Sequence, residues 1–165
     1  MKRSAAAKIK SLTELAPLLD AAREQDQRIV LTNGCFDLLH AGHLASLERA
    51  ARLGDILVVA VNSDDSVRRL KRDGRPLVGH SDRARLLAGL ECVDFVVIFE
   101  QDTPVVVIQA LRPHVHYKAG YTREQLPEAQ LVEALGGEVI AESYEQLGTQ
   151  GLSTSALLAR VRENG

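Results

Sequence analysis

Hydrophobic residues along the chain fall into two alternating patterns. Short β-prone runs, typical of buried strands, lie at 29–31, 56–61, 95–99, 115–118 and 139–141. Between these runs, apolar residues recur at helical spacing, as in Leu44, Leu47 and Ala50. Because strands and helices alternate, we predict an α/β fold: a Rossmann-like, doubly wound, five-stranded parallel sheet with flanking helices.

Capping signals mark where the predicted helices begin. Ser11 and Glu14 form a capping box for a first helix. Thr103 and Pro104 predict an N-cap followed by proline in the first helical position. Further helices are predicted over 44–53, after 64, around 86–90, over about 123–135 and after 153. We interpret residues 1–27 as an N-terminal helical arm and residues 28–165 as one domain.

Composition limits the classes of function. The chain has 165 residues, of which 45% are hydrophobic and 25% charged, as in ordinary globular domains. Its net charge of −2 and dispersed Lys and Arg residues argue against a nucleic-acid partner. No apolar stretch is long enough to span a membrane. Cys35 and Cys92 form no disulfide or metal framework, so we expect a reducing, cytoplasmic setting.

The loop after the first predicted strand carries the most informative motif. It reads Thr32-Asn33-Gly34-Cys35-Phe36-Asp37-Leu38-Leu39-His40-Ala41-Gly42-His43. In a doubly wound sheet, ligands bind beyond the carboxyl ends of the strands, which is where this loop lies. His40 and His43 stand at a predicted helix start, whose free N–H groups favour anions. Gly42 between them lets a phosphate approach the backbone closely.

This arrangement suits nucleotidyl transfer. The reaction requires fixed donors that stabilise charge on the α-phosphate and on the departing pyrophosphate. His40 and His43 would be those donors, while Asn33 or Asp37 would help to place substrate or metal. A single histidine here would indicate a cap, and a zinc site is the other interpretation of the spacing. His80, His114 and His116 offer no third zinc ligand at a recognisable spacing.

The segment from Asn33 to His43 resembles the signature of the His-x-Gly-His, cytidylyltransferase-like nucleotidyltransferase superfamily. Within it, the chain most closely resembles the ADP-heptose synthase family, the adenylyltransferase half of the bifunctional D-glycero-D-manno-heptose 7-phosphate kinase and heptose 1-phosphate adenylyltransferases. The similarity covers nearly the whole chain, including Ala60-Val61-Asn62-Ser63-Asp64, Leu70-Lys71, Gly74-Arg75-Pro76, Asp102-Thr103-Pro104 and Ser153-Thr154-Ser155. The sugar kinase half is absent, so we expect a stand-alone transferase.

The resemblance implies roles for individual residues. Catalytic roles fall on His40, His43 and Lys71. Nucleotide contacts fall on Asn33, Gly34, Cys35, Phe36, Gly42, Lys118, Gly120, Ser153 and Thr154. Substrate contacts fall on Asp37, Asn62, Arg75 and Arg83. ATP would be the co-substrate, with Mg²⁺ held mainly by the triphosphate and no protein ligand assigned to it, and a homodimer is expected.

Several of these positions have a plainer interpretation. Arg68, Arg69 and Arg72 can belong to a solvated, basic helix end or loop, and Arg83 can be a surface helix residue. Ser153 and Thr154 can simply cap the last helix. The resemblance gives Cys35 a packing role. For His114 and His116, which share one face of a strand, we favour a satisfied structural role.

The chain departs from the family pattern after the fourth predicted strand. The heptose enzymes usually read Lys-Gly-Gly-Asp-Tyr, whereas this chain has Lys118-Ala119-Gly120-Tyr121-Thr122 and lacks the acidic residue. The loop borders the base and ribose in this superfamily, so the choice of base and catalytic competence both depend on it. Tyr121 either stacks on or covers the nucleotide, or is an exposed aromatic residue.

These observations lead to one predicted reaction and two alternatives. The chain is predicted to transfer AMP from ATP to D-glycero-D-manno-heptose 1-phosphate, giving ADP-heptose and pyrophosphate. A first alternative is a cytidylyltransferase acting on glycerol 3-phosphate or another polyol or sugar phosphate. A second, motivated by the missing acidic residue, is a non-catalytic nucleotide-binding regulatory module.

Overall fold

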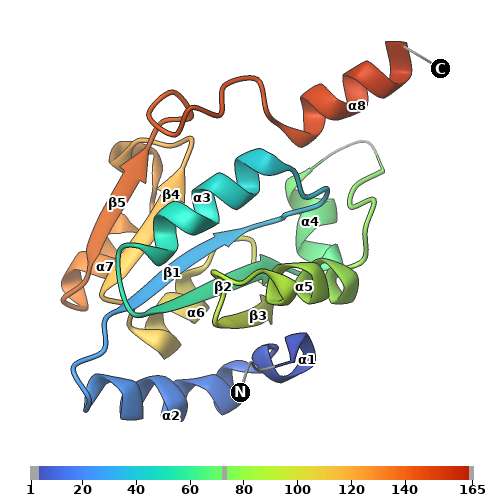
Figure 1. Cartoon of the computed structure of the whole chain (residues 1–165). Helices are drawn as coiled ribbons and strands as arrows, with labels where there is room; N and C mark the ends of the chain where they lie inside the picture. Colours follow the sequence, from blue (N-terminus) through green and yellow to red (C-terminus); the bar gives the residue numbers. More distant parts are fainter. Residues whose placement is uncertain (1–3, 72–73, 164–165) are drawn as a thin grey trace.

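A computed structural model describes residues 4–71 and 74–163 of the chain. Five parallel strands form one sheet in the order β3-β2-β1-β4-β5 (Figure 1). The strands are β1 (Ile29–Gly34), β2 (Ile56–Asn62), β3 (Phe95–Phe99), β4 (Val115–Ala119) and β5 (Glu138–Glu142). The predicted Rossmann-like α/β fold is thereby confirmed.

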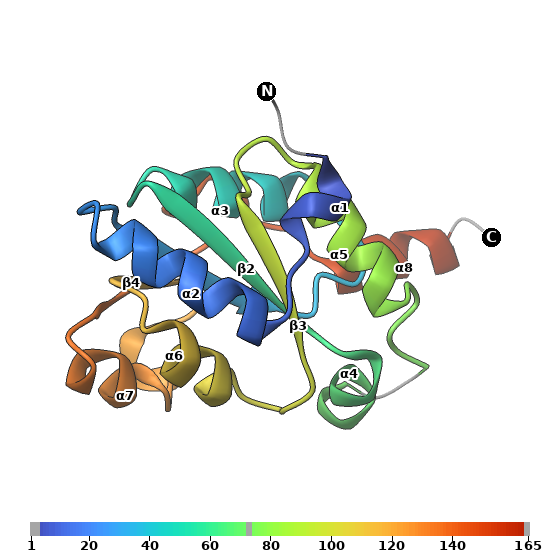
Figure 2. The ribbon, with the colours of Figure 1, turned by 90° about the horizontal axis from the view of Figure 1, so that it is seen from below.

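Helices cover both faces of this sheet. The helices of the described residues are α1 (Ala5–Lys8), α2 (Leu12–Arg23), α3 (Ala41–Ala51), α4 (Asp64–Leu70), α5 (His80–Gly89), α6 (Val105–Leu111), the 3-10 helix η1 (Arg123–Gln125), α7 (Ala129–Ala134) and α8 (Thr154–Glu163). Helices α3 and α5 pack on one face, and α2, α6 and α7 pack on the other (Figures 1 and 2). The chain thus forms three layers, with the sheet in the middle.

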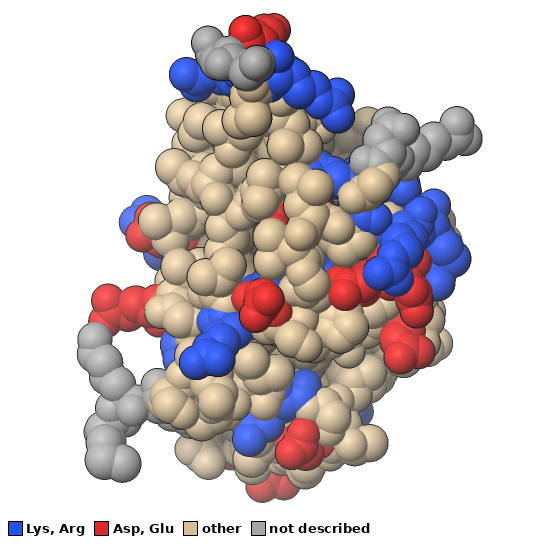
Figure 3. Space-filling view, turned by 90° about the vertical axis from the view of Figure 1, so that its right-hand side faces the viewer, with Lys and Arg blue, Asp and Glu red and all other residues tan. Residues whose placement is uncertain are grey.

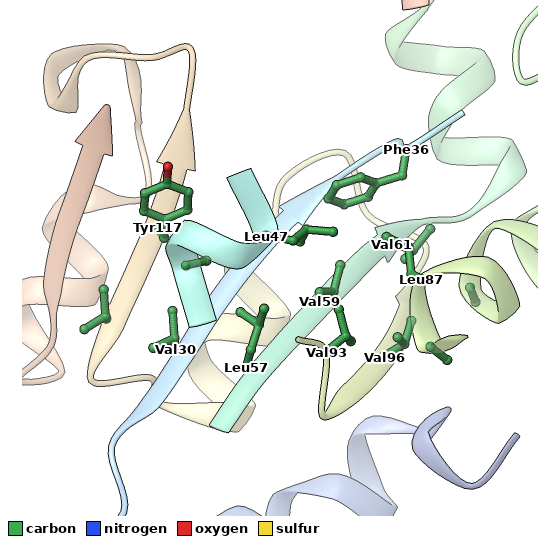
Figure 4. Close-up of a cluster of buried hydrophobic side chains, with 14 residues drawn as sticks. Val30, Phe36, Leu47, Leu57, Val59, Val61, Leu87, Val93, Val96 and Tyr117 are labelled. Carbon is green, nitrogen blue, oxygen red and sulfur yellow. The ribbon is translucent and has the colours of Figure 1, made fainter. Parts of the chain in front are cut away.

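Each strand sends alternate side chains into two hydrophobic clusters. Val30 and Tyr117 pack with Leu47 of α3 in the cluster drawn in Figure 4. Leu31 points to the opposite face and packs with Leu15 of α2. All five side chains are fully buried. Both faces of the sheet are therefore apolar, which explains why its strands are nearly continuous runs of Val, Ile and Leu.

The structure confirms some predicted helix boundaries and corrects others. Both halves of the Ser11–Glu14 capping box are present at the start of α2. Pro104 is the N-cap of α6, so the helix begins one residue later than predicted. The single helix predicted over 123–135 is wrong: η1 and α7 are separate. Pro127 lies between them, and proline disfavours helical backbone in the residue before it.

Gly54 stands where the chain turns from α3 into β2. The carbonyl oxygen of Arg28 accepts hydrogen bonds from the backbone N–H groups of Asp55 (2.8 Å) and Ile56 (3.1 Å). This contact brings the two backbones together at Gly54. A Cβ at position 54 would lie 2.6 Å from the Arg28 oxygen and 2.7 Å from Cγ2 of Val30. Only glycine fits there without a backbone shift.

We predict that Gly54→Ala lowers the free energy of unfolding by about 1–3 kcal/mol, because the added methyl group overpacks the start of β1 and β2. Urea denaturation measures this change. Gly89→Ala is the matched control: Gly89 ends α5, and a Cβ there meets nothing within 4 Å. That control should be neutral or gain up to about 1 kcal/mol. Equal losses in both variants would contradict the steric argument.

Candidate active site

A cleft of about 470 Å³ lies at the carboxyl end of the sheet. Its floor is built from the ends of β1 (Asn33 and Gly34), β2 (Asn62) and β4 (Lys118 and Ala119). In this sheet the strand order reverses between β1 and β4, and ligands of doubly wound folds bind at such a point. The cleft therefore lies where the topology of the fold places ligand sites.

Most of the predicted site residues line this one cleft, although they come from five segments of the chain. The residues that line it are Asn33, Gly34, Cys35, Phe36, Asp37, His40, Gly42, His43, Asn62, Lys71, Arg75, Lys118, Ser153 and Thr154. Gly120 and Arg83 do not line it. Arg72, from the predicted basic loop, lies outside the described residues.

The two histidines of the motif stack on each other beside the start of α3. Their ring centroids are 3.9 Å apart with an angle of 28° between the rings. Burial lowers the pKa of His40, while burial and then the neighbouring His40 lower the pKa of His43 to about 4. Both rings are therefore neutral at pH 7, and each can donate one N–H to a ligand.

Gly42 and Phe36 hold this histidine pair in place. A Cβ at Gly42 would lie 3.0 Å from Cε1 and Nδ1 of His40, so the absence of a side chain leaves room for the ring. Phe36 has a φ of 49°, which is unusual for a residue other than glycine. Its ring is nearly buried in the core and lies 5.4 Å from the His43 ring. Core packing thus holds a strained loop residue under the motif.

Asp37 is engaged by the protein itself. Its Oδ1 accepts hydrogen bonds from the backbone N–H groups of Leu77 (2.8 Å) and Val78 (3.0 Å). Its Oδ2 lies 2.9 Å from Nη1 of Arg75, an ion pair without hydrogen-bond geometry. Asp37 therefore fastens the 75–78 loop to the motif loop, and both of its carboxylate oxygens face partners within the protein.

Arg83 is fully buried behind the cleft, so the surface alternative for this residue is wrong. Its Nη2 donates to Oδ1 of Asp64 at 2.8 Å, and its Nε donates to the Val78 carbonyl at 2.8 Å. Its Nη1 donates to the carbonyl oxygen of Cys35. The structure thus shows Arg83 joining α5, α4 and two loops, rather than reaching into the cleft as the substrate contact expected from the resemblance.

Lys118 brings a buried positive charge to the floor of the cleft. Its Nζ donates to the backbone oxygen of Asn33 at 2.9 Å and to Oδ1 of the same residue at 3.2 Å. The ammonium also lies 5.0 Å from the centre of the Tyr121 ring. Burial lowers the pKa of Lys118 to about 8, an effect that the Glu128 carboxylate partly opposes. Lys118 is therefore still mostly charged at pH 7.

Gly120 packs closely against Tyr144, a residue that lines the cleft. It has a φ of +80°, and a Cβ there would lie 2.3 Å from Cζ of Tyr144, so the tyrosine ring packs directly on its backbone. Tyr144 and Tyr121 both line the cleft and are 49% and 44% exposed. At the position where the family resemblance led us to expect an acidic residue, this chain therefore has the aromatic ring of Tyr121 beside the ammonium of Lys118.

Helix α8 begins at the rim of the cleft. Ser153 caps it, because its Oγ accepts from the N–H of Ala156 at 3.1 Å. Thr154 Oγ1 lies 3.4 Å from the backbone oxygen of Leu38, linking the helix start to the motif loop. No residue of α8 is buried, and the helix extends away from the body (Figure 1). The capping role is thus present, and phosphate binding stays a prediction.

Sequence reasoning assigned no role to several residues that line the cleft. They are Thr32, Ser46, Val67, Leu70, Asp102, Ala119, Tyr144 and Leu152. Ser46 lies one helical turn after His43, a spacing that predicts a shared face. Tyr144 gave no local signal, because it comes close to Gly120 only through the pairing of β4 with β5.

Clusters of metal ligands and membrane-spanning helices are both absent from the described residues. Among residues 4–71 and 74–163, no three His, Cys, Asp or Glu side chains are grouped as metal ligands. Over the same residues, every helix is too short or too polar to cross a membrane. Positive and negative side chains are interspersed on the face drawn in Figure 3, without a broad field of one sign.

Comparison with known proteins agrees with this geometry. A family model described as cytidylyltransferase-like matches residues 31–160. The chain belongs to the cytidylyltransferase-like family. The bifunctional protein HldE of Pelobacter propionicus is 51% identical over 157 residues, which are 94% of this chain and 31% of that protein. HldE of Helicobacter pylori is 47% identical over 156 residues, with the same two coverages. The chain thus spans about a third of the length of these relatives.

Solved structures show the same fold. A lipopolysaccharide core biosynthesis protein from Thermoplasma volcanium aligns with a TM-score of 0.61 and 23% identity over 71% of this chain and 95% of that one. A pantoate-beta-alanine ligase from Francisella tularensis aligns with a TM-score of 0.58 and 12% identity over 82% of this chain and 66% of that one. These likenesses concern the fold alone. Membership of the cytidylyltransferase-like family confirms the predicted class of enzyme, a nucleotidyltransferase.

We predict that Arg83→Met destabilises the fold by about 3 kcal/mol or more, because it leaves buried carbonyl oxygens and Asp64 without their donor. Urea denaturation measures the loss. Arg85→Met is the control, since Arg85 lies on the same helix but is exposed. The control should change stability by about 0.5 kcal/mol or less. Similar stability of the two variants would show that the Arg83 contacts do not hold the loops.

We predict that affinity for ATP falls about threefold to tenfold between about pH 7 and about pH 9. Lys118, with a pKa near 8, loses its proton over this range, and the cleft loses a positive charge. Calorimetric titration with ATP at each pH measures the affinity. Lys118→Met should bind more weakly at about pH 7 and show no such decline. A decline of equal size in that variant would assign the titration to another group.

Proposed function

We propose that this domain transfers AMP from ATP to D-glycero-D-manno-heptose 1-phosphate. A phosphate oxygen of the sugar attacks the α-phosphorus of ATP, and the bond to the bridging oxygen of pyrophosphate breaks. The products are ADP-heptose and pyrophosphate. HldE relatives that are about half identical over nearly the whole chain support this acceptor. Because the chain spans only part of those proteins, the activity is tested on this chain itself.

The observation that carries the proposal is the concentration of phosphate-binding groups in one cleft. The neutral imidazoles of His40 and His43 supply N–H donors without adding charge. Lys71 and Lys118 supply positive charge from other walls. In the proposed reaction these fixed donors stabilise charge that develops on the transferred and departing phosphates. No covalent enzyme intermediate is needed.

In this proposal, Mg²⁺ enters with ATP as part of the substrate. The described residues offer no cluster of carboxylates for a resident ion, and Asp37 is already paired with Arg75. Asp102 lines the cleft but lies 2.7 Å from Nε of Arg69. Triphosphate oxygens and water are therefore the ligands that we propose for the ion. The homodimer and the cytoplasmic setting stay predictions.

The decisive experiment measures pyrophosphate release with magnesium, crossing ATP, CTP, GTP and UTP against heptose 1-phosphate and glycerol 3-phosphate. We expect release with ATP and heptose 1-phosphate. Release only with CTP and glycerol 3-phosphate would keep the chemistry and replace the substrates. Binding of ATP without release from any pair would indicate the regulatory module and overturn the proposal.

A variant in the motif ties the activity to this cleft. His43→Ala should lower turnover about 10²-fold or more, because one fixed donor to the transition state is lost. Since the His43 ring is stacked at the edge of α3, circular dichroism should show a retained fold. Arg85→Met, which changes an exposed residue of α5 that does not line the cleft, is the control and should keep normal turnover. Normal turnover in His43→Ala would place the reaction elsewhere.

A further inference from the structure

Three polar side chains meet on one face of the sheet, where β1 and β4 end. Asn33 lies two residues after Leu31 in β1, so the two side chains point to the same face of the sheet. Leu31 packs on the face that is covered by α2, α6 and α7. Tyr117 belongs to the opposite cluster, so His116 and Lys118 point to the same face as Asn33. Oδ1 of Asn33 lies 3.1 Å from Nε2 of His116 and 3.2 Å from Nζ of Lys118.

The chemistry of these groups fixes every donor and acceptor. An ammonium can only donate, so the Asn33 atom that faces Lys118 must be the amide oxygen. That oxygen has a second lone pair for His116. Nε2 of His116 must therefore carry the proton. Burial and then the charge on Lys118 lower the pKa of His116 to about 3, so the ring stays neutral and keeps a single N–H.

The rest of the His116 ring contributes no further hydrogen bond. The side chain is fully buried, and its Nδ1 has no hydrogen-bond partner among the described residues. An unpartnered buried acceptor costs free energy, so this histidine is a poorer core residue than an apolar side chain of similar size. Its favourable polar contact is the one with Asn33. The satisfied structural role predicted for His116 therefore holds for one nitrogen only.

We propose that His116 is a positioning residue that acts through Asn33. His116 and Lys118 together hold the amide oxygen of Asn33 on the β4 side. The amide nitrogen, which makes no hydrogen bond within the described part of the chain, is then the atom left to donate to an oxygen of the bound nucleotide. Without His116, the side-chain oxygen of Asn33 would accept a hydrogen bond from Lys118 alone, and the carboxamide would rotate more freely. This inference deepens the proposed function and rests on it for the identity of the ligand.

A double-mutant cycle tests whether His116 acts through Asn33. His116→Leu should lower kcat/KM for ATP about tenfold, through loss of one oriented hydrogen bond. His116→Gln, whose amide nitrogen can replace Nε2, should stay within about threefold of the parent. In an Asn33→Ala background, His116→Leu should have no further effect, because its target is gone. If His116→Leu lowered kcat/KM by the same factor in the parent and in the Asn33→Ala background, the proposal would be overturned.

His114→Leu separates positioning from general damage. His114 comes directly before β4, and its Nδ1 accepts from the N–H of Ile29 at the amino end of β1, away from Asn33. This control should keep the parent kcat/KM even where its melting temperature falls. A loss of kcat/KM equal to that of His116→Leu would show that the His116 effect is structural.

Nitrogen NMR of the unaltered protein provides a test that needs neither a variant nor turnover. It should show His116 with the proton on Nε2, and the side-chain amide of Asn33 as a resolved pair of signals. A proton on Nδ1 would overturn the inference. Failure of the proposed function looks different: pyrophosphate release would be absent with every substrate pair, while the His116 tautomer would be unchanged. In that case, the double-mutant cycle of His116 and Asn33 is measured with the affinity for ATP, by calorimetry, in place of kcat/KM.

Discussion

The buried guanidinium of Arg83 is the interaction on which the geometry of the cleft depends. It donates to Asp64 at the start of α4, to the Val78 carbonyl and to the Cys35 carbonyl. Asp37 reinforces the same junction by accepting from the N–H groups of Leu77 and Val78. These contacts are made out of water, so each carries more weight than a surface ion pair would. The motif loop and the 75–78 loop are thereby joined to each other before any ligand arrives.

This rigid junction explains how one loop can carry several demanding features. The motif loop contains Phe36 in a left-handed conformation and a stacked, partly buried pair of histidines. Each feature opposes folding: one through backbone strain, the other through desolvation of imidazole. Packing of Phe36 in the core and the contacts of Arg83 offset these costs. Fixed donors obtained in this way need little reorganisation when charge develops on a phosphate.

The parts of the site that sequence could predict are those whose signals are local. His40, Gly42 and His43 lie within one turn of a helix start, so their approach to a common ligand follows from spacing alone. The sheet follows equally from alternating apolar runs. The family resemblance then placed Lys118 and Ser153 near the same ligand, and the structure brings both to the cleft.

What the sequence could not predict depends on contacts between distant segments. Arg83 has the sequence context of an ordinary helix residue, and its burial becomes visible only when α5 is packed against α4 and the motif loop. The position of Tyr144 over Gly120 depends on the register between β4 and β5. The break before α7 differs from these cases, because Pro127 is a local signal for it that the prediction of one helix over 123–135 did not use.

The cleft also separates two kinds of electrostatic environment. On the α3 side, His40 and His43 are neutral, because burial opposes their protonation. On the β4 side, Lys118 keeps most of its charge at pH 7 despite burial, since the Glu128 carboxylate opposes the loss of its proton. A neutral donor binds phosphate oxygens without holding the product as strongly as a cation does. In the proposed reaction, the histidines therefore suit the phosphate that is transferred, whereas the lysines suit the more highly charged groups on either side of it.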